Sequence, residues 1–305
     1  MFPRGREVGV GSFRFRLRAG LAAVLLAAGA CQQSPGASGS IQLIDDAADT
    51  VSLAAPAQRI ASLIPSTTEL LFALGAGPRV VGRTKWCDWP AEAAQVSNLG
   101  DGIGPNVEAI LGVQPDLVLL YQSARNTEAA ERLRSMGIPT LLLRTDSFDD
   151  FRRTTRLLGR AAGLTPDAER LVAAFDSGLA AVDRRNRPDA PKVLILAWDQ
   201  PPMTIGRGSF LHEVVEQAGG RNIFADLATP DAPVSLEAIA ERAPDLVLTT
   251  SESPAFARRP EWRVIPAVRE RRFIVVTGSE YSRPGPRAPD AIRRLAAAID
   301  SLAGR

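Results

Sequence analysis

The chain of 305 residues has few of the side chains that carry metal and nucleophile chemistry. His212 is its only histidine, and Cys31 and Cys87 are its only cysteines. A dedicated zinc or other transition-metal site normally needs several nitrogen or sulfur ligands, so this composition argues against one. His212 and Glu213 lie in a predicted helix with no second metal-binding residue nearby, which favours a structural role for the histidine.

The motifs of phosphate binding and of nucleophilic catalysis are also missing. The stretch Gly-Arg-Gly-Ser at 206–209 lacks the remaining glycine and the lysine of a phosphate-binding loop. Ser66 is not in the Gly-X-Ser-X-Gly context of a serine hydrolase. Because the chain has no acid–base or nucleophile constellation, the sequence predicts a protein that is not an enzyme and needs no catalytic cofactor or metal.

Lysine is nearly absent, with only Lys85 and Lys192, so the basic residues are almost all arginine. Five arginines and one glutamate lie in the first thirty residues. Removing them from 36 basic and 34 acidic residues leaves 31 against 33, a net charge of −2. No basic stripe remains, which argues against a nucleic-acid partner. We expect a monomeric globular protein, long enough for two domains of ordinary size.

The N-terminal residues 1–30 have the pattern of a signal peptide. Basic residues up to Arg18 precede an apolar run at 19–30, which is too short to span a bilayer. Small residues stand directly before Cys31, as in a bacterial lipoprotein signal, where that cysteine is acylated and becomes the new N-terminus. The alternative is a plain secretory signal cleaved near Ala30. We expect an exported protein anchored by lipid at Cys31, with a flexible tether and a hairpin over 31–58.

One stretch of the sequence occurs twice. Residues 106–120 return as residues 235–249, with eight identical positions at a fixed offset of 129. In each copy a short helix is predicted from the glutamate to just before Pro-Asp, and an apolar run typical of a buried parallel strand follows. A single long-period repeat is not a solenoid, so it predicts two similar α/β lobes with a cleft between them.

The remaining pattern predicts two Rossmann-like lobes with parallel-rich sheets, at 59–165 and 188–305, joined by a helix within 166–187. Thr165 is a plausible N-cap, Pro166 suits the first helical position, and Pro188 blocks continuation. Twenty helical residues extend about 30 Å, enough to cross between lobes. An ordinary surface helix remains the alternative. Near the start of the first lobe, Ser66 and Glu69 have capping-box spacing.

Several aromatic residues fall at strand ends or in the loops just after them, where ligands bind to parallel α/β sheets. They are Trp86, Trp89, Tyr121, Trp198 and Tyr281. Broad aromatic faces suit a flat, partly apolar ligand. Packing is the alternative for each, and we assign Trp89, which precedes Pro90, to packing. The predicted ligand-binding residues are Trp86, Asp88, Tyr121, Trp198, Tyr281 and Arg283.

Four segments together resemble one known family. They are 59–69 (Arg-Ile-Ala-Ser-Leu-Ile-Pro-Ser-Thr-Thr-Glu), 87–90 (Cys-Asp-Trp-Pro), 106–108 (Asn-Val-Glu) and 115–118 (Pro-Asp-Leu-Val). They are similar to the periplasmic cobalamin-binding proteins, part of the wider group that delivers cobalamin, siderophores and haem to ABC importers. The resemblance covers the chain from Ile41 onwards. It implies two lobes joined by one rigid helix, with the ligand in the cleft and little hinge closure.

The resemblance also implies a partner. In this family one glutamate on each lobe docks onto arginines of the dimeric membrane permease, which works with ATPase subunits. Glu108 and Glu237 stand at those motif positions. The alternative is a negative charge favoured at a helix start by the helix dipole, and both explanations can hold together.

The ligand expected from the resemblance is cobalamin or a related corrinoid. Two departures from the cobalamin binders are the lack of tryptophan between Ala228 and Val234 and of an aromatic residue within 100–105. The second candidate is a ferric siderophore, for which positive charge would come from Arg83, Arg207, Arg283 and Arg287. The third is haem, with Tyr121 or Tyr281 as iron ligand. Two roles are open for Cys87: a ligand of a bound metal macrocycle, or a buried structural thiol. An enzyme or metallocluster protein on the same fold is the last alternative.

Overall fold

The computed structural model describes residues 40–185 and 187–303. The predicted signal peptide, the acylation site Cys31 and most of the tether therefore lie outside the described residues. Within the described ranges, no helix is long and apolar enough to cross a membrane.

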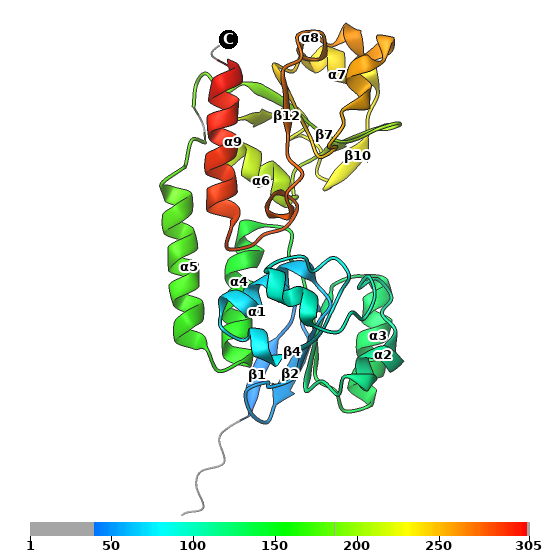
Figure 1. Ribbon diagram of the computed structural model, residues 1–305, viewed down its shortest axis with the longest axis vertical. Coiled ribbons are helices and arrows are strands. Elements are labelled where there is room, and N and C mark those ends of the chain that lie inside the picture. The colour runs from blue at the N-terminus through cyan, green and yellow to red at the C-terminus, as the bar shows by residue number, and fades with distance from the viewer. Residues whose placement is uncertain (1–39, 186, 304–305) are drawn as a thin grey trace, which may run out of the picture. The chain divides into compact units, whose positions relative to one another are not determined.

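The N-terminal lobe contains a hairpin and a four-stranded parallel sheet (Figure 1). The antiparallel hairpin strands are β1 (Ile41–Ile44) and β2 (Thr50–Leu53). The sheet has the order β4-β3-β5-β6. Its strands are β3 (Ile60–Ser62), β4 (Val80–Arg83), β5 (Leu117–Tyr121) and β6 (Thr140–Leu143). The helices are α1 (Pro65–Ala73), α2 (Val107–Gly112), α3 (Ala124–Ser135) and α4 (Phe148–Ala161), with 3-10 turns η1 (Gly77–Arg79) and η2 (Ala91–Gln95).

The C-terminal lobe has a mixed sheet with the order β10-β8-β7-β11-β12, and β9 pairs with β7. The strands are β7 (Lys192–Asp199), β8 (Pro202–Ile205), β9 (Arg221–Asn222), β10 (Asp231–Pro233), β11 (Leu246–Thr249) and β12 (Phe273–Val275). The helices are α6 (Phe210–Gln217), α7 (Leu236–Arg242), α8 (Pro266–Arg269) and α9 (Ala288–Ala303), with 3-10 turns η3 (Ala255–Arg258), η4 (Pro260–Val264) and η5 (Ser279–Tyr281). Strands β7, β11 and β12 run parallel, whereas β8 and β10 are added in antiparallel fashion.

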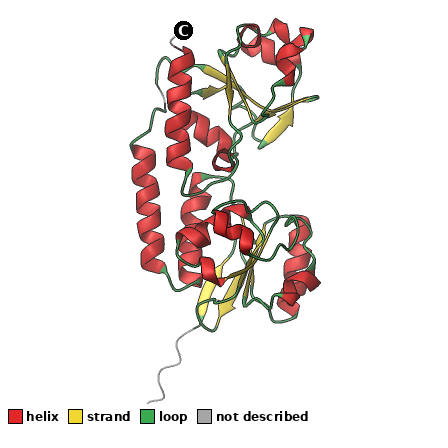
Figure 2. Cartoon of the chain, in the orientation of Figure 1, coloured by secondary structure: helices red, strands yellow, loops and turns green. Residues whose placement is uncertain are grey.

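The two repeat copies form the same helix–strand unit, α2–β5 in one lobe and α7–β11 in the other. Helices lie on both sides of each sheet (Figure 2), so both faces of these strands are covered. In β5, Leu117 and Leu119 join one buried cluster, while Val118 and Leu120 join the cluster on the opposite face. This explains the continuous apolar run, because successive strand residues point to opposite faces and here both faces are dry.

The helix between the lobes is α5 (Thr165–Ala180), shorter than the predicted span to Arg185. The predicted N-cap is also wrong, since Leu164 occupies that position and Thr165 is the first helical residue. At the other end, the Gln217 side-chain amide donates to the Leu179 carbonyl at 2.9 Å, and the Arg184 N–H donates to the Gln217 carbonyl. These two hydrogen bonds with Gln217 of α6 take the place of hydrogen bonds in a further helical turn, so the helix ends well before Pro188.

Helix α5 packs against α4 of the N-terminal lobe and α9 of the C-terminal lobe. The rings of Phe175 on α5 and Phe151 on α4 stack with centroids 4.0 Å apart. Phe148 on α4 meets Phe210 on α6 edge to face at 5.6 Å. One buried apolar cluster therefore continues from the N-terminal sheet through these helices to β7 and α9.

The start of α1 differs from the predicted capping box. Pro65 begins the helix, Ile64 is the N-cap, and no side chain caps the helix. The Ser66 hydroxyl is buried and has no hydrogen-bond partner among the described residues. The capping box fails because Glu69, its predicted second member, points to arginines of the other lobe instead.

Candidate functional site

A cavity of about 680 Å³ lies at the carboxyl ends of parallel strands from both lobes. Residues directly after β3, β5, β6 and β12 contribute to its wall, as the rule for ligand sites in parallel sheets predicts. From the N-terminal lobe the wall includes Leu63, Ile64, Pro65, Ser66, Trp86, Asp88, Asp101, Gly102, Ile103, Tyr121, Ser123, Asn126, Thr145 and Asp146. From the C-terminal lobe it includes Thr277, Ser279, Ser282 and Arg283.

The structure brings four of the six predicted ligand-binding residues to this wall: Trp86, Asp88, Tyr121 and Arg283. Trp86 is 58% exposed and Ile103 is 65% exposed, so both offer apolar surface to a ligand. Trp198 is 61% exposed near the end of β7, and its indole N–H donates to the Gln200 carbonyl at 2.8 Å. It does not line the cavity, so a ligand that contacts both Trp86 and Trp198 must be broader than the cavity itself.

Tyr281 is not in the wall of the cavity. Its ring packs against the apolar cluster that includes α9, and its hydroxyl donates to the Ala291 carbonyl at 3.2 Å. Trp89 also lies elsewhere, beside a second cavity of about 1160 Å³, with the Arg287 guanidinium over its ring at 4.5 Å. Trp89 is 46% exposed in this wall, so its packing role stays a prediction.

Tyr121 is paired with Asp146, a residue that the sequence did not single out. The tyrosine hydroxyl donates to the two carboxylate oxygens of Asp146 at 2.9 and 3.0 Å. Burial and the adjacent Asp146 raise the pKa of Tyr121 to about 12. Burial also raises the pKa of Asp146 above its ordinary value. The position of Asp146 just after a predicted strand was the available signal, because strand ends meet at this edge.

The charges in the cavity wall are mainly acidic. Asp88, Asp101 and Asp146 line it, and Arg283 is its only basic residue among those described. Arg283 is ion-paired with Asp88 and approaches Glu69 at 3.5 Å. Burial opposes the charge of Asp88, but the hydrogen bond and ion pair with Arg283 outweigh it and hold the pKa of Asp88 below its ordinary value.

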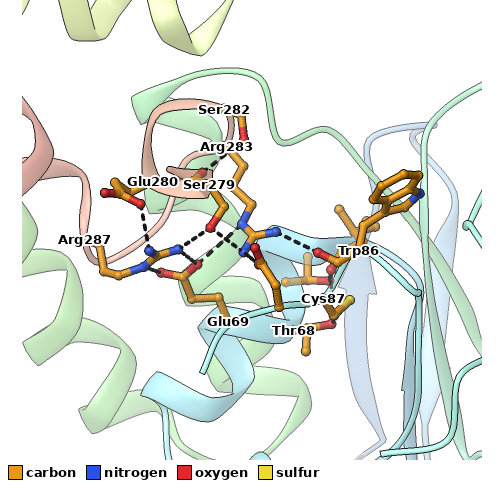
Figure 3. Close-up of polar contacts among 12 residues, drawn as sticks. Thr68, Glu69, Trp86, Cys87, Ser279, Glu280, Ser282, Arg283 and Arg287 are labelled. Atoms are coloured by element: carbon orange, nitrogen blue, oxygen red, sulfur yellow. Dashed lines mark hydrogen bonds and ion pairs between the residues drawn. The ribbon is translucent and has the colours of Figure 1, made fainter. Parts of the chain in front are cut away.

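Behind Arg283 lies a buried ion-pair network that the sequence did not reveal (Figure 3). Glu69 on α1 is only 3% exposed, and the Arg287 guanidinium meets its two oxygens at 2.8 and 2.9 Å. Arg287 also pairs with Glu280 at 3.0 Å. Glu69 and Arg287 come from opposite lobes, so no local spacing signals their pairing.

The other predicted arginines do not reach the cavity wall. Arg83 donates to the carbonyls of Thr84 and Ala94 at 2.8 and 3.0 Å. Arg207 donates to the Ala225 carbonyl at 2.9 Å. Arg283 and Arg287 are both ion-paired. Among residues 40–185 and 187–303, therefore, none of the four arginines considered for a siderophore is an unpaired cation in the cavity wall.

Cys87 is a buried thiol outside the cavity wall. Its sulfur lies 3.2 Å from the hydroxyls of both Thr68 and Thr84, which supports the structural alternative. His212 is half-buried on α6 near the Asn222 amide, and burial lowers its pKa. In the described part of the chain, no group of three or more His, Cys, Asp or Glu residues could hold a metal ion.

Glu108 and Glu237 occupy equivalent, exposed positions in the first turns of α2 and α7. Asn106 caps α2 through the N–H groups of Glu108 and Ala109, and Ser235 caps α7 through the Ala238 N–H. Hydrogen bonds at this helix start, from the Glu237 backbone and from Ser235, lower the pKa of Glu237. Neither glutamate forms an ion pair within the described ranges, so both carboxylates remain available at the surface.

Residues 60–279 match the family model described as periplasmic binding protein. The chain belongs to this family. It is 31% identical over 267 residues to the uncharacterized ABC transporter substrate-binding lipoprotein YvrC of Bacillus subtilis, covering 84% of each protein. It is 25% identical over 253 residues to the vitamin B12-binding protein of Vibrio parahaemolyticus, covering 81% of this chain and 91% of that protein.

A solved structure has the same fold. The periplasmic heme-binding protein RhuT from Roseiflexus has 28% identity and a TM-score of 0.73, covering 81% of this chain and 99% of that one. The predicted family resemblance and the two-lobed α/β fold are confirmed. Because the family consists of substrate-binding proteins of transport systems, the chain is not an enzyme.

Proposed function

We propose that the chain is the lipid-anchored substrate-binding protein of an ABC importer, and that it binds cobalamin or a related corrinoid between its lobes. The observation that carries the proposal is the cavity wall, in which exposed Trp86 and Ile103 stand beside acidic hydrogen-bond acceptors. A relative at 25% identity over most of both chains is a vitamin B12-binding protein, which supports the same ligand class.

The charge balance of the cavity favours a corrinoid over an anionic ligand. Asp88, Asp101 and Asp146 can accept hydrogen bonds from the amide side chains at the edge of a corrinoid. An anionic ferric siderophore would meet three carboxylates and one arginine whose charge is already paired. Like charges brought together in a partly buried site cost free energy, so this ligand is disfavoured.

Haem is the other alternative, supported by the likeness to the heme-binding protein RhuT. The Tyr121 hydroxyl is already engaged, because it donates to the two carboxylate oxygens of Asp146, and iron ligation would have to displace this hydrogen bond. Tyr281 lies outside the cavity wall. Both observations count against haem ligation by the two tyrosines considered.

The proposed delivery step uses Glu108 and Glu237. Two exposed carboxylates at equivalent positions of two similar lobes suit two equivalent basic pockets of a dimeric permease. We place the protein at the periplasmic face of a bacterial membrane or at the cell surface, held by lipid at Cys31. The lipoprotein name of the relative from Bacillus subtilis supports this location.

Isothermal titration calorimetry tests the ligand. Cyanocobalamin, an anionic ferric catecholate siderophore and hemin are titrated in separate runs into the purified chain carrying Cys31→Ser. We expect saturable heat with cyanocobalamin alone. Binding of the siderophore or hemin without binding of cyanocobalamin would overturn the ligand assignment.

A further inference from the structure

Glu69 joins the two lobes through a buried carboxylate. Its side chain is 3% exposed, and both oxygens are held by Arg287, 218 positions later in the chain. The loop carrying Arg287 approaches closely enough that a Cβ added at Gly285 would lie 2.9 Å from a Glu69 oxygen. Paired, bidentate geometry is what makes a buried carboxylate tolerable, and removal of one partner leaves an uncompensated charge.

Arg283 extends this network to the loop that carries Trp86 (Figure 3). Its guanidinium is 11% exposed, lies 3.5 Å from Glu69 and is ion-paired with Asp88. It also donates to the Trp86 carbonyl at 3.1 Å. One side chain of the C-terminal lobe therefore connects α1 with the Trp86 carbonyl and the Asp88 carboxylate, which lie on either side of Cys87.

Residues of the N-terminal lobe also contact the Trp86 loop and hold it in place. The Trp86 N–H donates to the Thr84 hydroxyl at 3.2 Å. The Cys87 sulfur lies 3.2 Å from Thr68, the residue before Glu69 on α1. Cys87 is 1% exposed, so its accessibility reports whether the loop stays in place.

The Trp86 indole is not fixed by packing, because more than half of it is exposed. Its position must come from its backbone. We propose that Glu69, Arg283 and Arg287 form a clasp between the lobes, and that Arg283 is the positioning residue that holds the Trp86 loop at the cavity before any ligand binds. That Trp86 contacts a ligand rests on the proposed function, whereas the clasp does not.

Thiol labelling of Cys87 tests the clasp without ligand. In full-length protein carrying Cys31→Ser, Cys87 is the only thiol, and its reaction with 5,5′-dithiobis(2-nitrobenzoate) is followed by absorbance. Opening of the loop must precede reaction of a buried thiol. Arg283→Lys keeps a positive charge beside Glu69 but cannot form the same fork to Trp86 and Asp88. We expect Arg283→Lys and Glu69→Gln each to speed labelling about tenfold or more.

Arg294→Met is the matched control. Arg294 pairs with Glu280 at 2.7 Å, close to the clasp, but touches neither Glu69 nor the Trp86 loop. The Cys87 labelling rate of the Arg294→Met variant should equal that of the parent. The clasp is refuted if folded Arg283→Lys protein, checked by circular dichroism, labels as slowly as the parent. The labelling experiment contains no ligand, so its result remains valid even if cyanocobalamin fails to bind in the titration.

Discussion

The Glu69 carboxylate and the Arg287 guanidinium form a two-pronged ion pair, with nitrogen–oxygen distances of 2.8 and 2.9 Å. Glu69 belongs to the first helix of one lobe and Arg287 to the loop before the last helix of the other. The carboxylate is buried, so the pair is shielded from the water and salt that weaken surface ion pairs.

Arg287→Met should lower the free energy of unfolding by about 3–5 kcal/mol, because it leaves the Glu69 carboxylate buried with only the more distant Arg283. Guanidinium chloride unfolding followed by circular dichroism measures this. The control is Arg156→Met, which breaks an exposed pair with Glu169 and should cost less than about 1 kcal/mol. Equal losses of unfolding free energy in the two variants would mean that the buried ion pair stabilises the fold no more than an exposed one.

Trp86→Ala should weaken binding of cyanocobalamin by about 1–3 kcal/mol, as expected for removal of a contacting aromatic side chain. Met136→Ala is the control, because Met136 is a large exposed side chain outside the cavity wall and its removal should leave affinity unchanged. Calorimetric titration compares the two variants with the parent. An unchanged affinity for Trp86→Ala would remove Trp86 from the site.

Tyr121 should titrate near pH 12, against about 10 for an ordinary tyrosine. The folded protein then keeps this proton after the unfolded chain has lost it. The stability that Tyr121 contributes is complete below pH 10 and is lost as the pH rises toward 12. Absorbance at the tyrosinate band of the Tyr281→Phe variant isolates this group. Asp146→Asn should bring the midpoint back toward 10, and no change would contradict the pairing.

Glu108→Ala combined with Glu237→Ala should abolish uptake while leaving ligand affinity intact, since both side chains are exposed and neither lines the cavity. Uptake of radiolabelled cobalamin by cells that depend on this protein is the measurement, with calorimetry on the same variant. Glu241→Ala, on the same helix as Glu237, serves as control. Lost affinity in the double variant would refute a docking role.

Cys31→Ser should release the protein from membrane fractions into the soluble fraction, because the proposed acyl chains at Cys31 would supply the membrane affinity. Immunoblots of fractionated cells show the distribution. Retention of the variant in the membrane would favour a different anchor from the one predicted.

The sequence was sufficient to predict those helices and strands whose formation depends on residues close together in the chain. Continuous apolar runs, the Pro-Asp before each run and the repeat were enough for β5 and β11 with their preceding helices. The hairpin predicted within 31–58 and the helix predicted at His212 and Glu213 are also present. The cavity residues Trp86 and Tyr121 could be found because strand ends gather at one sheet edge.

Errors arose where a distant partner overrides local preference. Glu69 has the spacing of a capping residue, but Arg287 of the other lobe satisfies its charge. The interlobe helix stops at Ala180, where Gln217 of α6, a residue distant in sequence, donates to the Leu179 carbonyl. Asp146 follows a strand end, but this position alone does not indicate that its carboxylate meets Tyr121. Such pairings depend on the assembled fold.

The apolar cluster that runs through both lobes has a consequence for folding. Phe151, Phe175 and Phe210 connect the N-terminal sheet with β7, and α9 closes the same core with Ile292 and Ile299. Neither lobe can lose this core alone, so thermal unfolding should be a single cooperative transition. A chain still in synthesis exposes the same apolar surface until residues 288–303 are available, so the shared core cannot close before these residues emerge.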